Sequence, residues 1–361
     1  DANADVRFVS GGLGPTHDDI TKDALCQVFN SKLIMNHEVE EHLIALFKRR
    51  NRTLSDTNRR QALVPDKSQI IFNEVGTASC LLFEKNKQLT FALPGVPFEF
   101  EWLVSNKIIP YLNEKINAND KIYSSDYTFI GIGESYLFDA IQSDTSVFEN
   151  NCEVAFLPSP GLVKVRITHS NPIMNTADND LFAKIDTKFK HIFSDVYLGK
   201  DTPSLSKLIH DMCVNNNITL SLAESCTGGY ISHLFTSNPG SSTFFKGSII
   251  AYSNEIKSKM LDVDKSTIEK HGAVSKETVE EMAVGAIKHF KTDYILSISG
   301  IAGPEGGTSE KPIGTVWVCV GNKNETKTQL FQLGGSLRTN IIERAAISAL
   351  FFLYKFIRDT L

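Results

Sequence analysis

The sequence predicts a multi-domain α/β protein, and three observations support this prediction. The 361 residues correspond to two or three domains at roughly 150 residues per domain. Hydrophobic residues make up 42% and charged residues 22% of the chain, a balance typical of globular proteins with buried cores. Short apolar strand patterns alternate with helical patterns at both ends of the chain, which is typical of sheets covered by helices.

Residues 1–120 form the first predicted domain. The expected strands lie at residues 5–10, 70–72, 79–84 and 89–93. The expected helices lie at residues 20–29, 38–49 and 98–103. In the second of these helices, Leu43, Ile44 and Phe47 recur at helical spacing. This alternation of strands and helices predicts a layered α/β domain.

Residues 121–200 form a smaller predicted connecting domain of the α+β type. The expected strands lie at residues 126–131, 153–156 and 161–169, and the expected helices lie near residues 134–142 and 179–191. The segment contains no G-x-x-G loop of the kind that clamps nucleic acids. We therefore interpret it as a structural spacer rather than an RNA-binding module.

Residues 204–361 form the third predicted domain, which follows a polar link with a proline at residues 200–203. Strand-like apolar runs lie at residues 218–222, 248–252, 294–299, 314–321 and 328–333. Helical patterns lie at residues 205–214, 230–235 and 339–357, and a further helix is expected to start after Ser275 as its N-cap. The last helix is heavily apolar, so we expect one of its faces in a core or a subunit contact, in a homo-oligomer.

Charge and cysteine usage restrict the partners and the compartment. A net charge of −5 and a pI of about 6.0 give no general attraction to nucleic acids or anionic membranes, so a phosphate-bearing ligand needs a local site. The six cysteines form no C-x-x-C pair, which favours reduced thiols over disulfides or a zinc site. No apolar run approaches the ~18 residues of a membrane span. We expect a cytoplasmic protein with a small-molecule ligand.

A serine at a strand-to-helix turn is the strongest sign of chemistry. Ser225 stands where the apolar run 218–222 gives way to the helical run 230–235. Its hydroxyl would face the free N–H groups of the helix start, which favour negative charge. Tyr252 and Lys257 follow downstream, and a lysine with a tyrosine can make a serine nucleophilic. The alternative is a tight glycine turn beside a surface lysine.

Cys226 is a competing nucleophile on chemical grounds. Cysteine enzymes usually pair the thiol with a histidine, and the sequence shows none near Cys226. His233 and His271 would come close only through folding. The sequence favours Ser225 and leaves Cys226 open.

An ordered series of short motifs runs through the chain. The motifs are residues 11–19 (GGLGPTHDD), 93–97 (LPGVP), 223–229 (AESCTGG), 239–242 (PGSS), 252–255 (YSNE), 272–275 (GAVS), 299–304 (SGIAGP), 306–307 (GG) and 312–316 (PIGTV). Each motif is weak alone, but together they resemble the CinA family of competence/damage-inducible proteins along the whole chain. The resemblance implies a molybdopterin-binding-like α/β domain at 1–120, a KH-like connector at 121–200 and a C-terminal α/β sandwich deamidase domain at 204–361.

The resemblance also implies an activity, the hydrolysis of nicotinamide mononucleotide to nicotinate mononucleotide and ammonia in NAD recycling. The matching positions make Ser225 the nucleophile, Lys257 its base and Tyr252 the group that bridges them. Lys257 can accept a proton near neutral pH only if burial lowers its pKa from ~10.4. This chemistry requires no cofactor and no metal.

Two loops and an arginine are expected to hold the phosphate of the nucleotide, because glycines let backbone N–H groups approach an anion closely. The first loop offers Thr227, Gly228 and Gly229. The second loop follows a predicted strand and offers Ser299, Gly300, Ala302 and Gly303. Arg338 resembles a phosphate-side arginine of the family, and Arg344 is the alternative.

The glycine loop at residues 11–19 resembles that of molybdopterin-binding folds, and in the CinA family it is linked to ADP-ribose pyrophosphatase activity. Asp18 and Asp19 would hold a divalent cation that bridges the pyrophosphate, although they would also suit a plain helix start. Ser79-Cys80 stands where the family usually has Pro-Gly, and we expect the front of this domain to be missing. A metal-dependent pyrophosphatase is thus one alternative function, and a non-enzymatic nucleotide- or pterin-binding scaffold is another.

Overall fold

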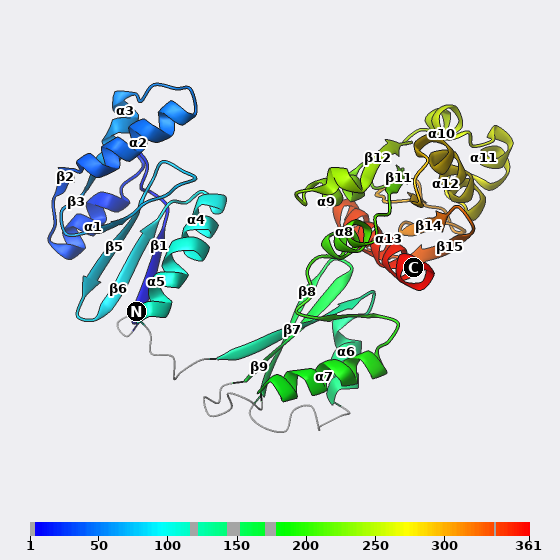
Figure 1. The fold of residues 1–361 in the computed structure, drawn as a ribbon, viewed down its shortest axis with the longest axis horizontal. Helices are drawn as coiled ribbons and strands as arrows, with labels where there is room; N and C mark the ends of the chain where they lie inside the picture. Colours follow the sequence, from blue (N-terminus) through cyan, green and yellow to red (C-terminus); the bar gives the residue numbers. More distant parts are fainter. Residues whose placement is uncertain (1–3, 116–121, 143–151, 170–177, 336) are drawn as a thin grey trace. The chain divides into compact units, whose positions relative to one another are not determined.

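The computed structural model describes residues 4–115, 122–142, 152–169, 178–335 and 337–361. The chain divides into two compact units, residues 1–120 and residues 121–361. Each unit combines sheets with covering helices, which confirms the predicted α/β class (Figure 1). None of the helices in the described ranges has both the length and the apolar character needed to cross a bilayer.

A four-stranded sheet in the order β1-β6-β5-β4 organises the first unit. Its strands are β1 (Val6–Ser10), β4 (Gln69–Ile71), β5 (Cys80–Lys85) and β6 (Gln88–Leu93). Strands β1 and β6 run parallel, and the other pairs are antiparallel. The helices are α1 (Thr21–Phe29), α2 (His37–Arg49), α3 (Asp56–Arg59), α4 (Pro97–Leu103) and α5 (Ile109–Lys115). A small antiparallel ribbon pairs β2 (Leu33–Met35) with β3 (Leu63–Pro65).

Close backbone contacts fix the glycine loop after β1. The N–H of Gly11 donates to the carbonyl of Leu93 at 2.9 Å, and the hydroxyl of Thr21 donates to the carbonyl of Gly11 at 2.8 Å. Gly12 has a φ of +68°, and a Cβ there would lie 2.3 Å from Thr21 Oγ1, so this position requires glycine. The contacts join the two N-terminal motifs, which are 82 residues apart at Gly11 and Leu93.

An antiparallel sheet in the order β10-β7-β9-β8 forms the first part of the second unit. Its strands are β7 (Tyr123–Ile130), β8 (Cys152–Ser159), β9 (Leu162–His169) and β10 (Tyr197–Lys200). One hydrophobic cluster joins this sheet to α6 (Glu134–Gln142) and α7 (Asp178–Ile192). Aromatic rings dominate the cluster, and Phe129 makes edge contacts with Phe189 and Phe193 at 5.3 and 5.2 Å between ring centroids.

A five-stranded sheet in the order β12-β11-β13-β14-β15 forms the rest of the second unit. Its strands are β11 (Leu220–Glu224), β12 (Phe245–Ile250), β13 (Tyr294–Gly300), β14 (Thr315–Asn322) and β15 (Thr326–Gln332). Strands β12, β11 and β13 run parallel, and β14 and β15 are antiparallel additions. The helices are α8 (Leu205–Asn215), α9 (Tyr230–Thr236), α10 (Asn254–Leu261), α11 (Lys265–His271), α12 (Lys276–Phe290) and α13 (Arg338–Thr360).

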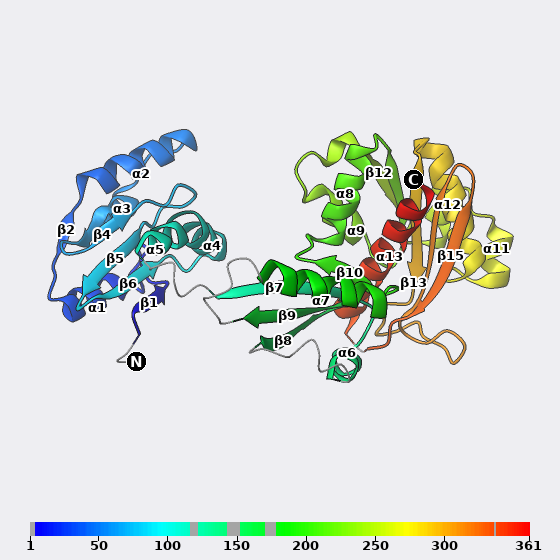
Figure 2. The same cartoon turned by 60° about the horizontal axis from the view of Figure 1, so that its bottom comes forward.

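Two hydrophobic clusters place these helices on opposite faces of the five-stranded sheet. Leu222 belongs to the cluster with α8, α9 and α13, whereas its neighbour Ala223 belongs to the cluster with α10, α11 and α12. Successive strand residues point to opposite faces, so the two clusters lie on either side of β11. The result is a helix–sheet–helix sandwich, in which α13 lies beside α8 (Figures 1 and 2).

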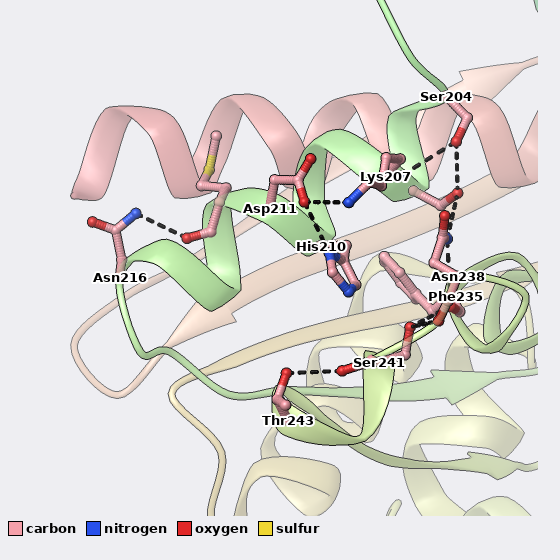
Figure 3. A network of polar contacts seen from close by, with 12 residues as sticks. Ser204, Lys207, His210, Asp211, Asn216, Phe235, Asn238, Ser241 and Thr243 are labelled. Carbon is pink, nitrogen blue, oxygen red and sulfur yellow. Dashed lines mark hydrogen bonds and ion pairs between the residues drawn. The ribbon is translucent and has the colours of Figure 1, made fainter.

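The turn at residues 239–243 forms hydrogen bonds with the C-terminal end of α9. Ser241 is buried, and its hydroxyl donates to the carbonyls of Phe235 and Asn238 at 2.6 and 2.7 Å (Figure 3). The amide of Asn238 donates in turn to the hydroxyl of Ser206 on α8 at 3.4 Å. This motif therefore satisfies carbonyls that the end of α9 leaves open, and its role is structural.

The strand boundaries beside the predicted serine site differ from the prediction. Strand β11 starts at Leu220 and continues to Glu224, and β12 covers 245–250, so that Tyr252 lies beyond the strand. The pairing of the two strands shifts after Leu220, and Gly247 has a φ of +141°, so no regular apolar alternation marks these ends. The structure also contains short elements that the sequence did not predict, among them β2, β3, β10, α3, α5 and α11.

Candidate active site

The structure brings Ser225 and Lys257 into direct contact. Ser225 follows the last residue of β11, and Lys257 lies on α10 beyond the end of β12. The amine of Lys257 donates to Ser225 Oγ at 2.9 Å and to the carbonyl of Ala251 at 2.8 Å. The two residues are only 7% and 1% exposed. Lys257 is therefore no surface lysine, and its amine contacts the serine hydroxyl directly.

Burial lowers the pKa of Lys257, as the predicted chemistry requires. Among the described residues, no carboxylate forms an ion pair with this lysine. Loss of water around an ammonium group favours the neutral amine, and only the neutral amine can accept a proton. The environment of Lys257 therefore suits a general base.

Cys226, the competing nucleophile, has the opposite character. Burial raises the pKa of its thiol to about 12. The thiolate is the nucleophilic form of cysteine, and this pKa leaves very little of it near neutral pH. The surroundings thus favour Ser225 over Cys226.

Tyr252 lies at the rim of the site, with 60% of its surface exposed. Its hydroxyl accepts a hydrogen bond from Arg338 at 2.7 Å, and Arg338 also donates to the carbonyl of Gly303 at 2.6 Å. Among the described residues, no hydrogen bond connects Tyr252 to Ser225 or Lys257. The bridging role that the resemblance implies for Tyr252 stays a prediction.

A cavity of about 240 Å³ opens above Ser225. It is lined by Ser225, Cys226, Tyr252, Asn254, Lys257, Ala273, Val274, Ser299, Gly300, Ile301, Ala302, Gly303, Glu305, Gly306 and Arg338. Five residues that the resemblance assigns to substrate binding thus line the same cavity as Ser225, namely Ser299, Gly300, Ala302, Gly303 and Arg338. The sequence analysis assigned no role to Asn254, Ala273 or Val274, although two of the quoted motifs contain them. Glu305 carried no signal in the sequence.

Thr227, Gly228 and Gly229 do not line this cavity. The hydroxyl of Thr227 and the N–H of Gly229 instead donate to the carboxylate of Glu224, at 2.7 and 3.0 Å. Two of the donors that the sequence analysis reserved for a phosphate are therefore occupied by a side chain of the protein, and the N–H of Gly228 donates to the carbonyl of Ser225 at 3.1 Å. Sequence reasoning missed Glu224, because its position at the end of an apolar strand gives no sign of where the carboxylate points.

Hydrogen bonds hold the other wall of the cavity. Ser299 Oγ donates to the carbonyl of Ala273 at 2.7 Å, and Lys311 donates to the carbonyls of His271 and Val274 at 2.7 and 2.8 Å. These bonds fix residues 272–275 against the loop after β13. The hydroxyl of Ser299 thus supports the wall, and its proton is already used there.

In the first unit, Asp19 forms a local turn. Its carboxylate accepts hydrogen bonds from the N–H and the hydroxyl of Thr16, at 3.0 and 2.5 Å, and the hydroxyl bond is the main cause that lowers the pKa of Asp19. Asp18 is exposed. Within the described ranges, no three His, Cys, Asp or Glu side chains gather as metal ligands. A divalent cation at Asp18 and Asp19 stays a prediction.

Family models match both ends of the chain. Residues 202–357 match the family model of the CinA C-terminal domain, and residues 1–114 match that of a probable molybdopterin binding domain. Among solved structures, the competence/damage inducible protein CihA from Agrobacterium tumefaciens is 33% identical, with a TM-score of 0.42. The match covers 43% of this chain and 93% of that one.

Curated relatives match along almost the whole chain. A CinA-like protein from Flavobacterium psychrophilum is 37% identical over 353 residues, which cover 97% of this chain and 84% of the relative. A putative competence-damage inducible protein from Halothermothrix orenii is 37% identical over 356 residues, 98% of this chain and 85% of that relative. Two matching family models and relatives of this similarity show that the chain belongs to the CinA family.

Proposed function

We propose that the C-terminal domain hydrolyses the carboxamide of nicotinamide mononucleotide to nicotinate mononucleotide and ammonia. The observation that carries the proposal is the 2.9 Å contact between the buried amine of Lys257 and Ser225 Oγ. A serine becomes a nucleophile when a neighbouring base takes its proton, and a desolvated lysine is such a base. The reaction belongs to NAD recycling in the cytoplasm. All six cysteines lie in the described ranges and no disulfide joins them, which is usual for cytosolic proteins.

The reaction proceeds in two stages, acylation of Ser225 and hydrolysis of the acyl-enzyme. Ser225 Oγ attacks the carboxamide carbon while its proton passes to the amine of Lys257, and a tetrahedral oxyanion forms. The carbon–nitrogen bond then breaks, and ammonia leaves with the proton from Lys257. A water molecule attacks the resulting ester in the same way, releases the carboxylate and restores Ser225. Backbone N–H groups beside the serine and along residues 302–303 are the candidate donors to the oxyanion.

Arg338 is the residue best placed for the phosphate of the substrate. Its two hydrogen bonds go to uncharged acceptors, the hydroxyl of Tyr252 and the carbonyl of Gly303. Among the described residues, no carboxylate pairs with Arg338, so its positive charge remains available at the rim of the cavity. Guanidinium groups bind phosphate oxygens in a bidentate manner. The pyridine ring would then extend from this rim toward Ser225.

The direct test is ammonia release from nicotinamide mononucleotide. We expect Ser225→Ala to lower kcat at least 1,000-fold and Cys226→Ala to keep most of the activity, because removal of a covalent nucleophile eliminates the reaction path. The reverse result would contradict the serine mechanism.

A second measurement tests the expectation that no metal takes part. Deamidation should persist in saturating EDTA, because the proposed steps use only side chains and water. Activity that EDTA removes and zinc or magnesium restores would contradict this mechanism. Metal-stimulated release of AMP from ADP-ribose would instead support the alternative function in the first domain.

A further inference from the structure

We propose that Glu224 is a positioning residue of this site, whose buried carboxylate holds the turn with Ser225 against the amine of Lys257. The inference rests on the proposed function, because it assigns a role in the same reaction. Glu224 is the last residue of β11, and its side chain has no exposed surface. A buried charge requires strong compensation, which makes its partners informative.

Five hydrogen-bond donors surround the carboxylate of Glu224. Oε2 accepts from the hydroxyl of Thr227 at 2.7 Å and from the N–H groups of Gly229 and Ile231 at 3.0 and 3.2 Å. Oε1 accepts from the N–H and the hydroxyl of Ser232 at 2.9 and 2.5 Å. All five donors belong to the segment directly after the serine. The carboxylate therefore binds the serine turn to the first turn of α9.

The main chain of Glu224 connects to the lysine side of the pair. The N–H of Ala251 donates to the Glu224 carbonyl at 2.7 Å, and the Ala251 carbonyl accepts from the amine of Lys257 at 2.8 Å. Glu224 is thus connected to both halves of the catalytic pair, to Ser225 directly along the chain and to Lys257 through Ala251. Its side chain accepts hydrogen bonds from the turn that follows Ser225. Its carbonyl accepts a hydrogen bond from Ala251, whose own carbonyl binds the amine of Lys257.

Only a carboxylate of this length satisfies the five donors. Glutamine would replace one acceptor oxygen with an NH2 group, which would face N–H or O–H donors and leave at least one of them unbonded. Aspartate is one methylene shorter than Glu224, so it would not span both groups of donors. Either change would release the turn with Ser225, and a displacement of about 1 Å can lower a rate by about 100-fold.

The test compares Glu224→Gln and Ser232→Ala with the unaltered full chain, with nicotinamide mononucleotide as substrate. We expect Glu224→Gln to lower kcat by about 100-fold. Ser232→Ala removes one donor to Oε1 and should lower kcat about 3–10-fold. KM should change less than threefold in both variants, because neither side chain lines the cavity. The matched control is Ser237→Ala after α9, whose hydroxyl donates to the His233 carbonyl and which should keep kcat unchanged.

Calorimetric titration with nicotinate mononucleotide separates positioning from loss of fold. One binding site per chain, with a Kd within threefold of the unaltered protein, would show that the pocket of Glu224→Gln is intact. A kcat near that of the unaltered chain in this variant would overturn the inference. If Glu224→Gln does not fold, the kcat of Ser232→Ala tests the inference instead. An unchanged kcat in Ser232→Ala would overturn the inference too. An unaltered chain without ammonia release would instead contradict the proposed function.

Discussion

Lys257 combines two properties that oppose each other at the scale of a single residue. Its amine is a suitable base because burial lowers its pKa. The same burial destabilises the folded protein whenever the amine is protonated, because the charged form is poorly solvated there. Catalysis and stability should therefore both depend on pH through this one group.

We predict that Lys257→Met changes the pH dependence of stability. The folded pKa of Lys257 is lower than its unfolded pKa, so between these two values the unfolded chain binds more protons, and stability rises with pH. The difference in unfolding free energy between the unaltered chain and Lys257→Met should therefore shift in favour of the unaltered chain as the pH rises toward the ordinary pKa of lysine, about 10.4. Chemical denaturation at several pH values measures this difference. A constant difference would contradict the burial of a neutral amine.

Tyr252 provides a second prediction at this scale. Because its hydroxyl binds Arg338 at 2.7 Å, Tyr252→Phe should release the guanidinium group and raise KM about tenfold, while kcat falls less than tenfold. Steady-state kinetics with nicotinamide mononucleotide separate the two parameters. A 100-fold lower kcat at constant KM would instead support the bridging role that the family resemblance implies.

The site residues differ in how far the sequence could predict them. Ser225 stood out through its local motif and Lys257 through its place shortly after the motif at 252–255, but the burial that suits Lys257 to the proposed role of a base depends on the whole sandwich. The contact between Tyr252 and Arg338 joins residues 86 positions apart, so no local pattern reveals it. Glu224 was missed because the direction of a side chain at a strand end is set by the helix that follows.

At the scale of elements, the packing of α12 against α10 depends on one glycine. Gly285 lies in the interior of α12, where glycine usually weakens a helix by about 1 kcal/mol relative to alanine. A Cβ at this position would lie 1.9 Å from the carbonyl oxygen of Leu261 at the end of α10. The close approach of the two helices therefore reverses the usual preference.

We predict that Gly285→Ala destabilises the C-terminal domain by about 2–3 kcal/mol, because the backbone must move to admit the methyl group. Its thermal midpoint should fall by about 5–10 °C. Val284→Ala is the matched control in the same helix, because Val284 is 61% exposed and its truncation should change stability by less than about 0.5 kcal/mol. An unchanged or higher midpoint for Gly285→Ala would show that α10 and α12 are farther apart than described.

Elements formed by interactions between residues close in sequence were predicted more accurately than elements formed by interactions between distant residues. Ser275 was predicted as an N-cap, and its hydroxyl does accept from the N–H of Thr278 at 3.2 Å. A cap involves residues three positions apart, so the sequence contains the whole signal. The ribbon of β2 and β3 was missed because it pairs three-residue strands about 30 positions apart, with no hairpin turn between them.

At the scale of the whole molecule, the site and its support come from different parts of the second unit. Every residue that lines the cavity lies between Ser225 and Arg338. However, the hydrophobic cluster under α13 also contains Ile130, and Leu162 and Leu198 pack against it from the antiparallel sheet. Activity should therefore need only the C-terminal domain, whereas stability should draw on both parts.

We predict that an isolated fragment of residues 203–361 folds and deamidates nicotinamide mononucleotide with a kcat within about threefold of the full chain. Its thermal midpoint should be lower than that of residues 121–361, because loss of Ile130, Leu162 and Leu198 exposes apolar surface, and burial of each such side chain contributes about 1.5–3 kcal/mol. Ammonia release and scanning calorimetry on the two fragments test both statements. A folded but inactive 203–361 fragment would show that residues before 203 complete the site, and equal midpoints would show that the antiparallel sheet adds no stability to the sandwich.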